Sequence, residues 1–346
     1  MGITHFQYFL LFVVTFAFVG FLTPIMRKVA INKQIYDAPT AAHKTHKEPV
    51  PYLGGVAIII GVVSVSYATA IYKDFGSKNL VLMTSVLAPA LVLGLIGLWD
   101  DMKNLRPGPR FAVQTLAGIF TAWILISENT VGTATGSKVI DAVITIVWVV
   151  GICNSINFFD NLDGGAAGTV AVTTSALFVL GFSGQQYMIA ALSAVTAGAT
   201  IGFLLWNKSP ARIYMGDAGA LFLGVLVATL TIRLKPDAEI QWTSFATPVL
   251  LLAVPILDTS VAVISRLKRG VSPFQGGHDH LSHRLIRAGL SRRRAAVSLW
   301  LLSALFAVAS ISITLTSRVV EQVIVGLAAV IWGCLFIAFF RTADSL

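Results

Sequence analysis

The stretch "LVLGLIGLWDD" (91–101) ends a long apolar run with two adjacent carboxylates. A run of this length can cross the hydrocarbon core of a bilayer as a helix. A charged side chain near hydrocarbon costs roughly 3 kcal/mol, and such residues usually serve a function. The stretch therefore predicts a membrane helix that carries Asp100 and Asp101 to the membrane–water interface. Adjacent helical residues point about 100° apart, so one carboxylate can bind an ion while the other orients a neighbour.

The rest of the chain has the same apolar character. The 346 residues are 56% hydrophobic and only 12% charged, with mean hydropathy +0.80, whereas soluble domains carry about 25% charged residues. The apolar runs are continuous, which predicts helices and not the alternating strands of a barrel. The sequence thus predicts an all-α polytopic membrane protein with one domain, residues 1–346, and about eleven transmembrane helices. The predicted spans are 6–26, 53–72, 79–99, 111–127, 139–153, 169–182, 186–205, 220–234, 245–264, 295–316 and 320–340.

The distribution of charge predicts the orientation. Arg27 and Lys28 follow the first run and no Lys or Arg precedes it, so we expect a retained helix with the N-terminus outside. Eleven spans then place the C-terminus in the cytoplasm. The predicted inner loops (27–52, 100–110, 154–168, 206–219, 265–294) and the tail hold 19 of the 25 Lys and Arg residues, as the positive-inside rule requires. The net charge of +9 therefore indicates topology and attraction to anionic lipid or substrate, and not nucleic-acid binding.

Polar residues gather in these inner loops, most densely in "NSINFFDNLDGG" (154–165). Asn154, Asn157 and Asp160 are spaced by three and would share one face of a helix, and Asp163 follows at the same spacing. Their oxygens are hard donors that suit Mg²⁺ better than zinc. A polar cap on a membrane helix is the competing interpretation, although a cap needs only one such residue.

Three further motifs lie in or beside the same loops. Asp217, in "NKSPARIYMGDAG" (207–219), is either a helix N-cap or a metal ligand. Asp258 follows Pro255 in an apolar span, which indicates either a functional acid or a structural hydrogen bond to a neighbouring helix. The last loop carries closely spaced histidines and arginines, which suit a phosphate-rich ligand. The set of residues fits phosphoryl transfer, which depends mainly on positioning and charge neutralisation.

These motifs together resemble the polyprenyl-phosphate N-acetylhexosamine-1-phosphate transferases. The resemblance covers about residues 20–290 and five ordered motifs: "DAP…KTH…PVPYLGG", "DD", "NSINFFDNLDG", "PARIYMGDAG" and "PILDT…R…HLSHRL". It implies that a polyprenyl phosphate attacks the β-phosphate of a UDP-amino sugar and releases UMP. It also implies dependence on Mg²⁺, with Mn²⁺ as a substitute, and a site facing the cytoplasm of a bacterial inner membrane. Membrane lipids and a second copy of the chain are further partners that it allows.

The resemblance also implies a role for individual residues. The metal ligands fall on Asn157 and Asp217, and the catalytic acids on Asp100, Asp101, Asp160 and Asp163. The substrate-binding positions are Lys44, His46, Arg110, Asn154, His280, His283 and Arg284.

The sequence departs from the family pattern at two positions, which concern the contacts to the sugar and the diphosphate. Ser282 replaces the middle histidine of the usual H-x-H-H motif, and Gly277 stands where an acid is common. "PVPYLGG", "HLSHRL" and the eleventh span favour the branch that uses UDP-GlcNAc. The alternative in the same family is a phospho-MurNAc-pentapeptide transferase. An intramembrane prenyltransferase or a secondary transporter fits less well, since these predict helical Asp pairs in two halves or repeat symmetry with acids at mid-helix.

Overall fold

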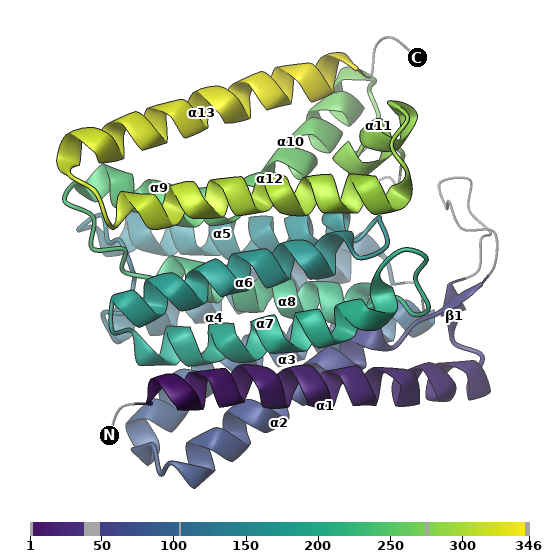
Figure 1. The fold of residues 1–346 in the computed structure, drawn as a ribbon, viewed down its shortest axis with the longest axis horizontal. Helices are drawn as coiled ribbons and strands as arrows, with labels where there is room; N and C mark the ends of the chain where they lie inside the picture. Colours follow the sequence, from purple (N-terminus) through teal and green to yellow (C-terminus); the bar gives the residue numbers. More distant parts are fainter. Residues whose placement is uncertain (1–2, 38–48, 104, 274–276, 343–346) are drawn as a thin grey trace.

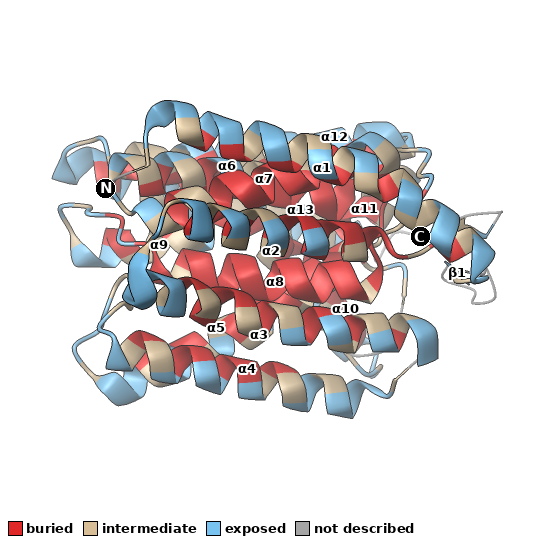
Figure 2. Ribbon diagram, turned by 90° about the horizontal axis from the view of Figure 1, so that it is seen from below, coloured by how far each residue is buried: buried red, intermediate tan, exposed pale blue. Residues whose placement is uncertain are grey.

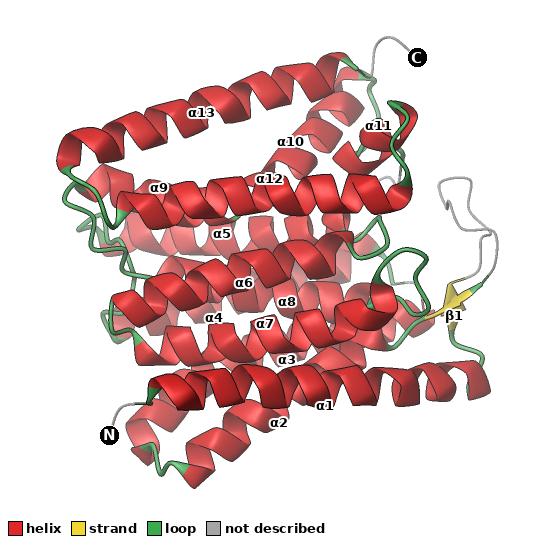
Figure 3. Cartoon of the chain, viewed as in Figure 1, coloured by secondary structure: helices red, strands yellow, loops and turns green. Residues whose placement is uncertain are grey.

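The computed structural model describes residues 3–37, 49–103, 105–273 and 277–342. In this part of the chain the protein is a bundle of helices with one short two-stranded ribbon (Figures 1 and 3). Strand β1 (Tyr36–Asp37) pairs antiparallel with β2 (Val50–Pro51). The helices are α1 (His5–Asn32), α2 (Gly54–Tyr72), α3 (Gly76–Lys103), α4 (Pro107–Ser127), α5 (Lys138–Phe159), α6 (Gly165–Ser183), α7 (Tyr187–Asn207), α8 (Gly216–Arg233), α9 (Gln241–Leu251), α10 (Ala253–Lys268), α11 (Leu281–Arg287), α12 (Arg292–Ile313) and α13 (Arg318–Arg341).

The number of apolar helices confirms the predicted membrane fold. Within the described residues, ten helices are long and apolar enough to span a bilayer, and α9 with α10 forms an eleventh span that is bent by 72°. All eleven predicted runs fall on these helices. Several helices extend beyond the runs into polar sequence; α5, for example, continues through the asparagines to Phe159.

Helix α8 is the centre of the bundle. It packs against α2, α3, α5 and α6, and Figure 2 shows it buried along its length while the outer helices expose their surfaces. Gly97 of α3 permits close packing, because a Cβ there would lie 2.3 Å from the carbonyl oxygen of Asp217. A central helix in a membrane bundle needs such small contact residues, since backbones must approach closely for van der Waals packing.

The bend in the ninth span has a local cause. Proline has no N–H to donate to the carbonyl four residues earlier, so Pro255 leaves the Leu251 carbonyl without its helical partner. The hydroxyl of Thr173 on α6 donates to that carbonyl at 2.9 Å. A freed backbone group at membrane depth needs such a replacement. The bend separates α9 from α10 at Leu252, three residues before Pro255.

The alternating course of the helices brings distant loops together at one end of the bundle. Helices α3, α5, α7 and α10 end there, and α4, α6, α8 and α12 begin there, at the right of Figure 1. Helix α1 begins at the opposite end, whereas α13 finishes at this one. We call this the site end of the bundle.

Candidate active site

The acidic cluster at the site end is centred on Arg110, at the start of α4. Its Nη1 donates to Asp217 Oδ2 at 2.5 Å and also to Asp100 Oδ2. Asn157 Nδ2 donates to the other oxygen of Asp217 at 2.8 Å. Four residues from four helices (α3, α4, α5 and α8) are thus brought into one set of polar contacts.

Asp101 has a different task from its neighbour Asp100. Its carboxylate accepts the backbone N–H of Asp217 at 2.8 Å and that of Ala218 at 3.1 Å. These are orphan donors in the first turn of α8, which has no side-chain cap of its own. Asp101 therefore caps α8 from α3. The interpretation of Asp217 as the N-cap is wrong, because Met215 holds that position and Asp217 lies inside the helix.

The loop before α8 is held on two sides. Asp163 accepts the backbone N–H of Ala211 at 3.1 Å and the hydroxyl of Tyr214 at 3.4 Å. On the other side, the N–H groups of Gly54 and Gly55 donate to the carbonyls of Tyr214 (3.0 Å) and Met215 (2.9 Å). This explains the glycine pair of the "PVPYLGG" motif, since a Cβ on Gly55 would lie 2.2 Å from the backbone of α8. In this structure Asp163 fixes a loop and lies beside the acidic cluster.

Asn154 and Asp160 flank Asn157 on the same strip. Asn154 donates to Gln114 Oε1 on α4 at 2.7 Å and to the Val150 carbonyl at 2.8 Å. Asp160 is the C-cap residue of α5. Burial, followed by the negative charges of Asp217 and Asp163, raises the pKa of Asp160 to about 8. Asn154 and Asn157 therefore lie on α5 itself, whereas Asp160 and Asp163 lie in the turn after this helix.

The donor chemistry of the cluster fits Mg²⁺. No group of three His, Cys, Asp or Glu side chains is arranged to hold a metal among the residues that the structure describes. Mg²⁺ does not require one, because it is commonly bound by one or two carboxylates, several waters and substrate phosphates. The guanidinium of Arg110 already lies between two of the carboxylates, so this position favours a positive charge.

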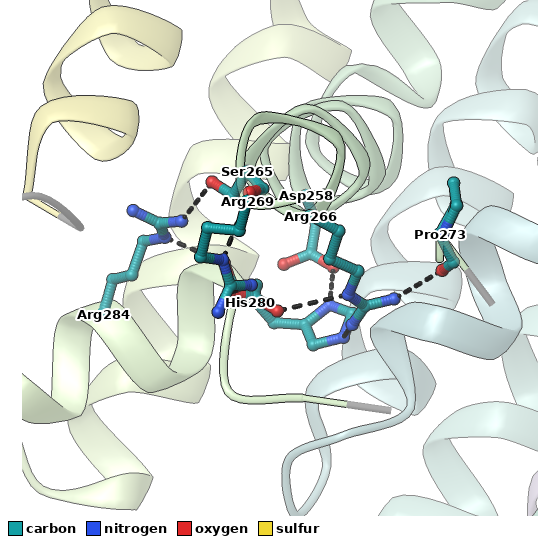
Figure 4. A network of polar contacts seen from close by, with 8 residues as sticks. Asp258, Ser265, Arg266, Arg269, Pro273, His280 and Arg284 are labelled. Carbon is teal, nitrogen blue, oxygen red and sulfur yellow. Dashed lines mark hydrogen bonds and ion pairs between the residues drawn. The ribbon is translucent and has the colours of Figure 1, made fainter. Parts of the chain in front are cut away.

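The histidine motif forms a second network, around Asp258 of α10 (Figure 4). The buried Asp258 carboxylate accepts the backbone N–H of Leu281 and contacts His280 Nδ1, both at 2.7 Å. Arg266 Nη2 lies 3.1 Å from His280 Nε2. Because a guanidinium only donates, Nε2 must accept and Nδ1 must carry the proton. Both ring nitrogens of His280 are thus bound within the protein, and Asp258 forms the structural hydrogen bonds that were one of its two interpretations.

Arg284 and Asp279 belong to the same network. Arg284 donates to the Asp279 carbonyl and Ser265 Oγ at 2.8 Å, and to the Phe339 carbonyl at 2.5 Å, so it joins α11 to α10 and α13. Asp279 pairs with Arg266 and Arg269. Burial opposes ionisation of Asp279, but these two arginines outweigh it and hold its pKa below the usual range.

His283 is the partly exposed imidazole of the motif. Its ring contacts that of His278 at 4.8 Å between centroids. Burial, followed by the neighbouring His280 and His278, lowers the pKa of His283 to about 4. The ring is therefore neutral at pH 7, with donor and acceptor roles open to a ligand.

The histidine network and the acidic cluster meet at residues 154–161, the asparagine-rich segment at the end of α5. Ser282, the residue that replaces a histidine, donates its hydroxyl to Asn161 Oδ1. Phe158 lies 5.7 Å from the guanidinium of Arg266 and contacts the ring of His280. Gln114, Arg266 and Asn161 were missed as site residues, because only their tertiary contacts reveal them. Lys44 and His46 lie outside the described residues.

The amino-acid sequence is similar to those of known proteins over most of its length. Residues 83–235 match the family model described as Glycosyl transferase family 4. The chain is 32% identical over 339 residues to a probable undecaprenyl-phosphate N-acetylglucosaminyl 1-phosphate transferase of Bacillus subtilis, covering 95% of this chain and 87% of that protein. It is 33% identical over 284 residues to a decaprenyl-phosphate N-acetylglucosaminephosphotransferase of Mycolicibacterium smegmatis, covering 74% and 70%. A phospho-N-acetylmuramoyl-pentapeptide-transferase of Anoxybacillus flavithermus is 29% identical over 320 residues, covering 88% and 95%.

Proposed function

The chain belongs to glycosyl transferase family 4, and we propose that it transfers GlcNAc-1-phosphate from UDP-GlcNAc to undecaprenyl or another polyprenyl phosphate. The products are polyprenyl-diphospho-GlcNAc and UMP, and the reaction starts a lipid-linked cell-envelope polysaccharide. The observation that supports this most is the contact of Asp100, Asn157 and Asp217 around Arg110. The two GlcNAc-phosphate transferases among the relatives favour UDP-GlcNAc over UDP-MurNAc-pentapeptide.

The reaction needs little proton transfer. A phosphate monoester has its second pKa near 6, so the lipid phosphate is largely a dianion at pH 7 and can attack without a strong base. An oxygen of that phosphate bonds to the β-phosphorus, and the bond from the β-phosphorus to the bridging oxygen breaks and releases UMP. The difficulty is repulsion between two anions, which positive charge and positioning relieve.

We assign the charge neutralisation to Arg110 and to a Mg²⁺ held by Asn157 and Asp217. The ion would shield the diphosphate and orient its oxygens. Asp101 keeps Asp217 in position through the α8 backbone, and Asp100 holds Arg110 beside it. Burial and neighbouring carboxylates raise the pKa of Asp160, so a cation held nearby would favour its ionised form. The neutral, partly exposed His283 is the member of the histidine motif that we assign to the nucleotide sugar.

We also propose that the site end faces the cytoplasm of a bacterial inner membrane. Its loops carry most of the basic residues, which the positive-inside rule places on that side. The donor would then arrive from the cytoplasm and the acceptor from the membrane.

The experiment measures UMP release by the purified protein with polyprenyl phosphate and Mg²⁺. We expect release with UDP-GlcNAc, little with UDP-GalNAc or UDP-MurNAc-pentapeptide, and none after chelation of the metal. Asp217→Asn should lower the rate at least 100-fold, because removing a single pre-organised electrostatic group commonly costs this much. The control is Asp141→Asn, a buried aspartate at the opposite end of the bundle, bonded to Thr135.

Each part of the proposal can fail separately. Release that persists without metal would exclude the Mg²⁺ assignment. A higher rate with UDP-MurNAc-pentapeptide would establish the alternative substrate. Equal loss in both aspartate variants would show a general effect on folding and not a site at Asp217.

A further inference from the structure

Helices α1 and α7 approach each other closely at two glycines of α7. A Cβ on Gly198 would lie 2.4 Å from the Phe12 carbonyl oxygen, and one on Gly202 would lie 2.4 Å from that of Phe16. The two backbones therefore touch along a small-xxx-small pattern typical of membrane helix pairs. One turn after Gly202, the large side chain of Trp206 ends this contact.

Trp206 is fixed in that position by a proline on α1. Pro24 cannot donate to the Gly20 carbonyl four residues earlier, so this carbonyl lacks its helical partner. The indole Nε1 of Trp206 donates to it at 2.9 Å. The indole thus satisfies a backbone group at membrane depth and keeps the two helices apart toward the site end.

A groove opens where the helices separate. It has a volume of about 370 Å³, and its lining includes Phe16, Phe21, Pro24, Leu205, Trp206 and Arg212. Phe21 and Leu205 are 77% and 46% exposed, so the groove opens on the surface that would face lipid. Among the residues that the structure describes, Arg212 is the only charged one in its lining, and the remaining walls are apolar.

Two cations lie at the polar end of the groove. The guanidinium of Arg212 lies 5.8 Å from the centre of the Trp206 ring, a cation–π contact that restrains it. Arg27 Nε donates to the Arg212 carbonyl at 3.0 Å, which brings the second cation alongside. Within residues 3–37, 49–103, 105–273 and 277–342, no carboxylate forms an ion pair with either arginine. An apolar slot that ends in two arginines is complementary to a lipid chain with a phosphate at its end.

We propose that this groove binds one anionic phospholipid, with its phosphate at Arg212 and Arg27 and one acyl chain against Trp206. The site is separate from the acidic cluster, which lies on α3, α4, α5 and α8. It is linked to the cluster by the loop before α8, since Arg212 follows Ala211, whose N–H donates to Asp163. A bound headgroup would therefore steady the same loop from the lipid side.

The test uses Trp206 as the reporter. The full chain is placed in phosphatidylcholine nanodiscs that contain a minor fraction of dibrominated phosphatidylglycerol, or the same fraction of dibrominated phosphatidylcholine. Bromine quenches only indoles that it contacts, and subtracting the signal of Trp206→Phe isolates this tryptophan from the other six. We expect the brominated phosphatidylglycerol to quench the Trp206 signal at least threefold more than the brominated phosphatidylcholine.

Charge variants decide between a site and ordinary lipid contact. Arg212→Gln with Arg27→Gln should reduce the preference to about one, whereas Arg318→Gln, an exposed arginine at the opposite end, should leave it unchanged. Equal quenching by both lipids in the unmodified chain would overturn the proposal. So would displacement of the brominated lipid by polyprenyl phosphate more readily than by unbrominated phosphatidylglycerol. If Trp206→Phe does not fold, native mass spectrometry must show that Arg212→Gln loses one bound phosphatidylglycerol; retention of all bound lipids would also refute the site.

Discussion

Asp101 on α3 holds the backbone of Asp217 on α8, with 2.8 Å between its Oδ1 and the Asp217 nitrogen. The neighbouring Asp100 instead contacts Arg110. The two adjacent carboxylates thus have different partners: Asp101 accepts N–H groups at the start of α8, and Asp100 pairs with the guanidinium of Arg110. The division follows from helical geometry, since consecutive side chains diverge by about 100°.

Asp101→Ala should therefore lower stability as well as activity. It leaves two N–H groups at the start of α8 without an acceptor, which costs about 0.5–2 kcal/mol. Asp101→Asn keeps one acceptor oxygen and should recover part of this loss. Thermal unfolding of the detergent-solubilised protein measures the effect. Asp217→Asn is the comparison, because it should abolish UMP release while keeping the unfolding temperature. If Asp101→Ala and the unmodified chain unfolded at the same temperature, the capping role would be wrong.

Gly216→Ala should damage the same contact from the other side. Gly216 has φ +68°, and a Cβ there would lie 2.5 Å from Asp101 Oδ2. Alanine in this backbone region costs roughly 1–2 kcal/mol, and the clash additionally displaces the Asp101 carboxylate. Gly270→Ala is the matched control, since Gly270 has φ +67° and a Cβ there would meet no atom of the described residues within 4 Å. We expect similar loss of stability from backbone strain in both, but at least tenfold loss of UMP release only in Gly216→Ala. Equal activity of the two variants would contradict this account.

The low pKa of His283 predicts a pH effect on stability. The folded protein keeps this imidazole neutral down to about pH 4, whereas the unfolded chain takes up a proton near pH 6.5. The free energy of unfolding should therefore fall as the pH drops through 6.5, by about 1 kcal/mol between pH 7.5 and 5.5. His283→Gln cannot bind the proton in either state and should lose this part of the dependence. Denaturation midpoints of both proteins at the two pH values give the difference, and parallel shifts would refute it.

Much of the fold could be predicted from the sequence because hydrophobic length alone identifies a membrane span. The helix ends were less accurate. Helix α5 continues six residues beyond the apolar run that predicts it, and its asparagines there bond to residues of neighbouring helices. The pairing of β1 with β2 was not predicted, because two-residue strands carry no periodic signal.

The location of the candidate site could be predicted from the sequence, but the hydrogen-bond partners of its residues could not. Charge asymmetry and motif order placed the polar loops together, and the structure brings Asp100, Asn157 and Asp217 into contact. No spacing could show that His280 is bound on both nitrogens by Asp258 and Arg266, because these partners lie on a helix 22 and 14 residues earlier in the chain. The resemblance assigns His280 to the substrate, which stays a prediction; in this structure both of its ring nitrogens have partners within the protein.

Thr173→Val tests the physical origin of the broken ninth span. The substitution keeps the shape of the side chain and removes the donor to the Leu251 carbonyl, which Pro255 cannot replace. A buried backbone group without a partner costs about 1–3 kcal/mol, so the unfolding temperature should fall. Thr174→Val is the control, because Thr174 is equally buried and its hydroxyl bonds only to carbonyls of its own helix.

The same substitution in a Pro255→Ala background completes the test. Alanine restores an N–H that can reach the Leu251 carbonyl, so Thr173→Val should then cost less than half as much. The difference between the two costs is the coupling energy of Thr173 with the proline-induced break. A cost that is identical in both backgrounds would show that the hydroxyl does not compensate for the proline, and the bend would need another cause.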